Sequence, residues 1–105
     1  MQIVIPMSGV GQRFIDAGYD IPKPLIEVDG RPIIQHVIEL FPGESNFIFI
    51  CNTTHLKETN MKEILQSIAP QGKIIEISPH KKGPVYAVSK IFDQIDDQDE
   101  VIVNY

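Results

Sequence analysis

The amino-acid sequence predicts an α/β fold in which helices cover both faces of a parallel β-sheet. Short apolar runs alternate along the chain with amphipathic segments, and turns containing Gly or Pro separate them. This alternation, from strand to helix and back, is typical of parallel strands joined by right-handed crossovers. The chain has 105 residues, of which 43% are hydrophobic. Residues 1–105 are therefore expected to form one unit with a real core.

Four strands are expected. The run from Gln2 to Met7 is continuously apolar, which suits a strand buried on both faces of a sheet. The four predicted strands are residues 2–7, 46–51, 73–78 and 99–104. We expect the third, second, first and fourth strands to lie in that order, which gives a three-layer, Rossmann-like fold.

Three amphipathic helices are expected between these strands. They begin at Pro32, after Asn60, and at Gly83–Pro84. Asn60 and Glu63 have the spacing of a capping box. The residues expected to face the sheet are Ile34, Val37, Ile38, Phe41, Met61, Ile64, Leu65, Ile68, Val88, Ile91, Phe92 and Ile95. The segment before the first helix, up to about Arg31, is expected to be irregular and rich in proline.

Composition excludes several function classes. The formal net charge of −5 disfavours a nucleic-acid-binding role, because such domains are usually basic. No run approaches the ~18 apolar residues of a membrane span, and the first residues lack the basic start of a secretory signal. Cys51 is the single cysteine, expected as a small buried hydrophobe. We expect a cytoplasmic protein without membrane or nucleic-acid partners, and a loop position for His55.

A glycine turn follows the first strand, from Ser8 to Phe14. In a sheet of the expected order, ligands bind at the carboxyl ends of the strands, where the order reverses. Gly9 and Gly11 let the backbone approach a ligand, with N–H groups directed at anionic oxygens. Arg13 offers a bidentate contact to phosphate. A glycine turn of this kind also occurs simply to reverse the chain, and both interpretations stay open.

Two well-known nucleotide motifs do not fit. Phe14 replaces the third glycine of the dinucleotide fingerprint, and Cys51-Asn52-Thr53 lacks the acidic residue expected after the second strand. No Gly-Lys-Ser/Thr follows, so the P-loop pattern fails as well. Lys23 stands between Pro22 and Pro24, which restrict the backbone on either side. It is either a lysine held for a fixed anion or a solvated lysine in a stiff loop.

Together, three segments resemble the signature of the sugar-1-phosphate nucleotidyltransferases. They are Gly9-x-Gly11-x-Arg13-Phe14, Pro22-Lys23-Pro24-Leu25 and Val28-Asp29-Gly30-Arg31-Pro32-Ile33. With the later segment around Gly83, the resemblance extends over essentially the whole chain. It implies transfer of a nucleotidyl group from a nucleoside triphosphate to a sugar 1-phosphate, giving a nucleotide sugar and pyrophosphate.

The resemblance also implies roles for individual residues. Arg13 and Lys23 are implied to be catalytic: Arg13 holds the phosphates that leave as pyrophosphate, and Lys23 neutralises charge near the α-phosphate. The residues implied to bind the nucleotide are Ser8, Gly9, Val10, Gly11, Lys82 and Gly83. Gly83 is expected closest to the base. Many family members carry a glutamine and small residues where this chain has His80 and Tyr86, so the base is not identified.

The family also uses Mg²⁺, held by an acidic residue after the fourth strand. That position falls beyond Tyr105, so no metal ligand is assigned within the chain. The acidic cluster around Asp97 precedes the fourth strand and is expected to be a solvated turn. We therefore expect the nucleotide-binding front half of a longer domain, inactive alone and able to self-associate. A silent nucleotide-binding regulatory module, cytidylyl transfer to a non-sugar alcohol phosphate, and a structural domain remain alternatives.

Overall fold

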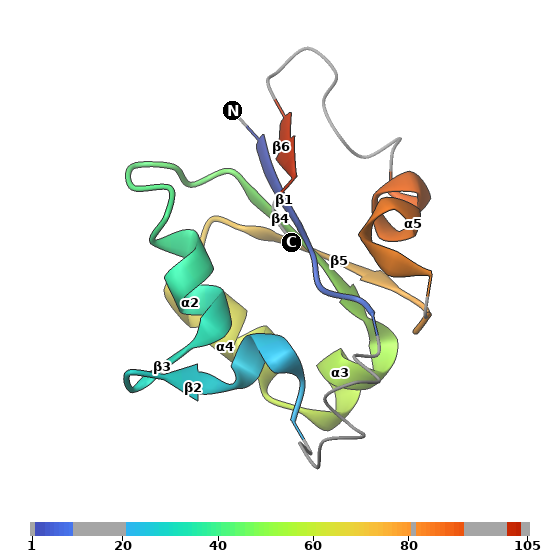
Figure 1. The fold of residues 1–105 in the computed structure, drawn as a ribbon, viewed down its shortest axis with the longest axis horizontal. Coiled ribbons are helices and arrows are strands. Elements are labelled where there is room, and N and C mark those ends of the chain that lie inside the picture. Colours follow the sequence, from blue (N-terminus) through green and yellow to red (C-terminus); the bar gives the residue numbers. More distant parts are fainter. Residues whose placement is uncertain (1, 10–20, 81, 92–100, 104–105) are drawn as a thin grey trace.

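The computed structural model describes residues 2–9, 21–80, 82–91 and 101–103, and its centre is a parallel sheet (Figure 1). The four strands of this sheet are β1 (Gln2–Pro6), β4 (Phe47–Asn52), β5 (Lys73–Ile77) and β6 (Val101–Val103). They lie in the order β5-β4-β1-β6, and every neighbouring pair is parallel. The predicted α/β class with a parallel sheet is confirmed.

Helices lie on both faces of the sheet. In Figure 1, α2 and α4 lie on one side of the strands and α5 lies on the other. The helices are α2 (Ile33–Ile38), α3 (Thr53–Glu58), α4 (Met61–Ile68) and α5 (Gly83–Lys90), together with the 3-10 helix η1 (Lys23–Leu25). A small antiparallel hairpin, β2 (Glu27–Val28) and β3 (Arg31–Pro32), precedes α2.

The core has two apolar layers, because successive side chains of a strand point to opposite faces. Val4, Ile48 and Ile50 face α5, where Ala87 and Ile91 are buried against them. The opposite faces of β1 and β4 pack against α2 and α4. The buried residues of this second layer include Ile3, Ile5, Phe47, Phe49, Cys51, Ile34, Met61 and Leu65. Full burial on both faces explains the continuous apolar runs of β1 and β4.

Aromatic packing makes the layer under α4 tight. The rings of Phe47 and Phe49 stack with their centroids 5.9 Å apart. Phe41 approaches the Phe47 ring edge-on at 6.5 Å. A Cβ atom at Gly72 would lie 2.7 Å from the Phe49 ring and 3.1 Å from the carbonyl oxygen of Ala69. Gly72 is therefore required by the close packing of the turn that enters β5.

Residues 23–32, directly before α2, form regular elements, and the expectation of an irregular stretch was wrong for this described part. Asp29 and Gly30 have φ angles of 54° and 78° and close the β2–β3 hairpin. A two-residue hairpin turn of type I′ needs positive φ at both central positions, and Asp-Gly is a preferred pair for it. The backbone N–H of Ile33 donates to the carbonyl oxygen of Ile26, which joins the hairpin to the start of α2.

Three further expectations about helices need correction. α3 was not predicted, and it places His55 in a helix rather than a loop. The side chain of Asn60 makes no cap hydrogen bond; instead the Met61 N–H donates to Thr59 Oγ1 at 3.2 Å. α2 ends at Ile38 instead of reaching Phe41, although Phe41 still packs against the core. Phe92 and Ile95 lie outside the described residues.

Candidate functional site

The site lies where the chain leaves β1, at the carboxyl edge of the sheet. Gly9 forms a parallel β-bridge with His80, which follows β5. The first residues of the glycine turn therefore lie beside the segment that leads into α5 (Figure 1). The predicted proximity of these two segments is confirmed for their described residues.

Ser8 is held through its side chain by His80. Ser8 is 1% exposed, and its Oγ lies 2.7 Å from His80 Nε2. The backbone N–H of Lys82 donates to His80 Nδ1 at 3.2 Å. Because a backbone N–H can only donate, Nδ1 must be the unprotonated nitrogen. Neutral His80 therefore carries its hydrogen on Nε2 and donates it to the Ser8 hydroxyl oxygen.

Asn52, the last residue of β4, holds the backbone of Ser8 and is fully buried. Its Nδ2 donates to the Ser8 carbonyl oxygen at 3.0 Å, and its Oδ1 accepts from the His55 backbone N–H at 2.7 Å. These two backbone partners settle the orientation of the amide. The second Nδ2 hydrogen then donates to His55 Nδ1 at 3.1 Å.

In the sequence, Asn52 stood out only because it occupies a position where the dinucleotide fingerprint expects an acidic residue. Its preference for helix N-caps could have indicated α3. No local pattern could have indicated the contact with Ser8, which is 44 positions away in the chain.

Both imidazoles of the site are biased toward the neutral form. Burial lowers the pKa of His55, an effect that the negative charge of Glu58 opposes. Burial and the positive charge of Lys82 lower the pKa of His80. Each histidine can accept a hydrogen bond at Nδ1 only while it is neutral. The contacts to the two Nδ1 atoms, which orient Asn52 and His80 beside Ser8, therefore depend on unprotonated imidazoles.

A basic and aromatic surface adjoins this network. Lys82 Nζ lies 4.9 Å and Lys90 Nζ 5.3 Å from the centroid of the Tyr86 ring. The His80 ring contacts the same tyrosine at 4.8 Å between centroids. Two ammonium groups around a ring that contacts His80 favour an anion on this surface.

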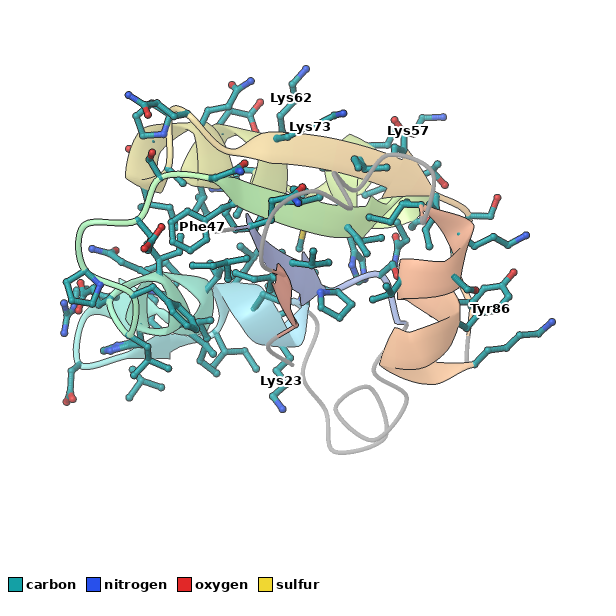
Figure 2. The ribbon with its side chains drawn as sticks, turned by 90° about the horizontal axis from the view of Figure 1, so that it is seen from above. Lys23, Phe47, Lys57, Lys62, Lys73 and Tyr86 are labelled. Atoms are coloured by element: carbon teal, nitrogen blue, oxygen red, sulfur yellow. The ribbon has the colours of Figure 1, made fainter. Side chains whose placement is uncertain are left out.

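The structure brings some of the predicted site residues together. Ser8 and Gly9 lie beside His80, Lys82 is exposed, and Gly83 is the first residue of α5. Lys23 is the exposed first residue of η1, flanked by Pro22 and Pro24 as the sequence indicates. In Figure 2, Lys23 projects from the side of the molecule opposite to Lys62 and Lys73. Val10, Gly11 and Arg13 lie outside the described residues.

Neither a metal centre nor a membrane span is found in the described part of the chain. No three His, Cys, Asp or Glu side chains gather there into a possible metal site. Within the same residues, no helix has the length and apolar character needed to cross a membrane. The acidic residues around Asp97 lie outside the described residues.

A parallel sheet with a glycine turn after its first strand defines the class of α/β proteins that take ligands at the carboxyl edge of the sheet. No protein-family model matches the chain. The glucose-1-phosphate cytidylyltransferase of Salmonella typhimurium is 34% identical over 53 residues, 49% of this chain and 21% of that protein. The UTP–glucose-1-phosphate uridylyltransferase of Haemophilus ducreyi is 27% identical over 56 residues, 51% of this chain and 19% of that protein.

A solved structure agrees with these relatives. The nucleoside-diphosphate-sugar pyrophosphorylase of Vibrio cholerae superposes with a TM-score of 0.67 at 26% identity. The superposition covers 90% of this chain and 43% of that one. The relatives of this chain are thus sugar-1-phosphate nucleotidyltransferases. The matched segments span only about a fifth of the length of these curated relatives.

Proposed function

We propose that the chain is the nucleotide-binding part of an enzyme that transfers a nucleotidyl group from a nucleoside triphosphate to a sugar 1-phosphate. A phosphate oxygen of the sugar 1-phosphate bonds to the α-phosphorus, and the bond between the α-phosphorus and the departing oxygen breaks. The products are a nucleotide sugar and pyrophosphate. The observation that carries the proposal is the exposed Gly9, which lies beside His80 at the carboxyl edge of the sheet.

Packing against the described residues does not explain why a glycine stands at position 9. A Cβ built on Gly9 meets none of their atoms within 4 Å, whereas one on Gly72 collides with Phe49. Gly9 also has no positive φ that would demand glycine, unlike Gly30. Close approach of a ligand to the backbone is a physical reason for a residue without a side chain at an exposed position of this kind. A phosphate group, which backbone N–H groups bind well, fits such a position.

The cations of the chain suit a reaction in which charge develops on phosphate oxygens. We propose that Arg13 contacts the two phosphates that leave as pyrophosphate and that Lys23 neutralises charge near the α-phosphate. Lys82 and Gly83 would bind the nucleotide beside the glycine turn formed by Ser8, Gly9, Val10 and Gly11. Positioning and charge neutralisation account for most of the catalysis in phosphoryl and nucleotidyl transfer, and no protein nucleophile is needed.

The described residues do not fit a magnesium site, because no suitable group of ligands lies among them. We propose, from the resemblance to the nucleotidyltransferases, that the ligands of Mg²⁺ lie beyond Tyr105. We propose that residues 1–105 form one portion of a longer nucleotidyltransferase domain, since the matches span about a fifth of the curated relatives. Cys51, a free thiol, suits a reducing compartment such as the cytoplasm.

Nucleotide binding tests this proposal directly. The chain, labelled with ¹⁵N, would be titrated separately with CTP, UTP, ATP and GTP while its amide resonances are followed by NMR. We expect weak binding, with a dissociation constant near the millimolar range, or about 4 kcal/mol. The amides of Gly9, His80 and Lys82 should shift most. Shifts confined to the β2–β3 hairpin, or none with any nucleotide, would contradict the proposed site.

Substitution of Arg13 tests the catalytic assignment in the complete enzyme that we propose. Arg13→Ala should lower turnover by about thirty- to thousandfold, because the contact strengthens as pyrophosphate departs. Lys62→Ala, which removes an exposed cation from α4, serves as the control. An unchanged turnover number with only a raised Michaelis constant for the sugar phosphate would refute the role of Arg13. Nucleotide binding without turnover would favour a regulatory module, and turnover only with a non-sugar alcohol phosphate would favour the other alternative.

A further inference from the structure

Ser8 is clamped from two directions by residues far away in the chain. Asn52 Nδ2 donates to its carbonyl oxygen from the end of β4, and His80 Nε2 donates to its hydroxyl oxygen from beyond β5. Ser8 and Asn52 are both buried. We call Ser8, Asn52 and His80 the Ser8 clamp.

The burial of Ser8 separates its task from that of Gly9. Ser8 is 1% exposed, and its carbonyl and hydroxyl oxygens both accept hydrogen bonds from within the protein. Gly9, the next residue, is exposed. The clamp therefore determines the position and direction in which the backbone emerges from β1 and becomes accessible to a ligand.

We propose that Asn52 and His80 are positioning residues for nucleotide binding, and that His80 performs this task only as the neutral tautomer with its hydrogen on Nε2. This inference rests on the proposed function, since it requires that the turn after Ser8 binds phosphate. Preorganisation is the physical reason. A backbone already held in position at Ser8 and Gly9 loses less conformational freedom when a ligand binds there.

Protonation of His80 would leave Nε2–H able to donate to Ser8 but would remove the acceptor that holds the ring in place, because Nδ1 could no longer accept from the Lys82 N–H. With both ring nitrogens protonated, Nδ1–H would face the Lys82 N–H, so that two donors would oppose each other. Among the described residues, the charged groups near this ring are Lys82 and, across Tyr86, Lys90, and the positive charge of Lys82 disfavours protonation of His80. His55 Nδ1 likewise accepts a hydrogen bond from Asn52 Nδ2 and would lose it on protonation, which the negative charge of Glu58 favours. Nucleotide affinity should therefore fall in acid through the loss of this geometry.

Glutamine at position 80 provides the sharpest test. Its amide nitrogen can donate to Ser8 Oγ while its oxygen accepts from the Lys82 N–H, so both hydrogen bonds can form without a titratable group. His80→Phe removes both bonds. Asn52→Asp retains an acceptor for the His55 N–H but removes the donation to the Ser8 carbonyl. His36→Gln is the matched control, because His36 Nε2 donates to the Val28 carbonyl oxygen in the hairpin, away from Ser8.

The experiment measures dissociation constants of the chain for CTP, UTP and inorganic tripolyphosphate at several pH values between 5.5 and 8. Circular dichroism verifies that each variant is folded. We expect His80→Phe and Asn52→Asp to weaken binding at pH 8 by about five- to tenfold, the effect of one hydrogen bond. His80→Gln and His36→Gln should bind as the wild type does at pH 8. The phosphate groups themselves titrate near about pH 6, so the informative quantity is the difference between wild type and His80→Gln.

Each outcome separates the two proposals. Weaker wild-type binding at acidic pH, with a smaller loss in His80→Gln, supports the clamp. If a probe binds and its affinity is the same for the wild type, His80→Phe and Asn52→Asp, the positioning role of the clamp is overturned. The proposed nucleotide-binding function is not affected by that result. No binding of any probe by the wild type would overturn the proposed function and the positioning role with it. NMR of the imidazole nitrogens gives an independent check: a hydrogen on His80 Nδ1 at pH 8 would also overturn the clamp.

Discussion

Two parts of the interior are held together by different forces. The layer beneath α4 is apolar, with Phe47, Phe49, Met61 and Leu65 all buried. The carboxyl ends of β1 and β4 are equally buried at Ser8 and Asn52, but hydrogen bonds with defined donors and acceptors hold this region. Apolar contacts tolerate small shifts, whereas hydrogen bonds specify where an atom lies. The comparison teaches that stability resides mainly in the first region and the geometry of the candidate site in the second.

The largest effect is expected from an aromatic residue of the apolar layer. Phe49→Ala removes a fully buried ring that stacks on Phe47 and should lower the free energy of unfolding by about 3–5 kcal/mol. Urea denaturation measures the change. Leu40→Ala is the control, because Leu40 is 66% exposed and should change stability by less than about 0.5 kcal/mol. Similar losses in both variants would show that the apolar layer is not the main source of stability.

A pair of glycine substitutions separates the two regions more finely. Gly72→Ala places a Cβ against Phe49 and the Ala69 carbonyl, and should cost about 1–3 kcal/mol of stability. Gly9→Ala meets no described atom and should leave stability within about 0.5 kcal/mol, while weakening triphosphate binding. Thermal unfolding and nucleotide titration of both variants test this. If Gly9→Ala lost stability but bound nucleotide normally, Gly9 would serve the packing of the fold and not the binding of a ligand.

Acid should weaken the polar region before the apolar layer. The pKa values of His55 and His80 are lowered in the folded chain, so at pH values just below 6.5 the unfolded chain binds more protons. Stability is therefore full above this range and declines as pH falls from 6.5 toward the lowered folded-state values. Urea unfolding at pH 7.5 and 5.5 measures the decline, which should be smaller in a variant carrying both His55→Gln and His80→Gln. An identical decline in that variant would assign the effect to other groups.

The smallest effect concerns the only cysteine. Burial, and to a lesser degree the negative charge of Glu76, raises the pKa of the Cys51 thiol to about 12. Almost no thiolate exists at pH 8, so iodoacetamide should leave the folded chain unmodified and alkylate it in urea. Mass spectrometry after equal incubation times distinguishes the unmodified from the alkylated chain. Rapid alkylation of the folded chain would indicate that β4 opens readily.

The sequence by itself determined the elements that depend on local periodicity and composition. The apolar runs predicted β1, β4, β5 and β6. The 3.6-residue stripes and the Pro or Gly residues at their ends predicted α2, α4 and α5. The burial of Cys51 followed from the same pattern. Such features are predictable because the residues that specify an element lie within it.

The tertiary structure decided what depends on contacts between distant residues. α3 has no buried residue of its own, so no apolar stripe in the sequence indicated it, and its N-cap is the asparagine that also holds Ser8. The sequence could place the glycine turn at the carboxyl edge of the sheet, but it could not show what holds that turn. Ser8 meets His80 across 72 positions of the chain. That partnership exists only because parallel pairing brings the ends of separate strands to one edge, where a buried polar atom must find a partner.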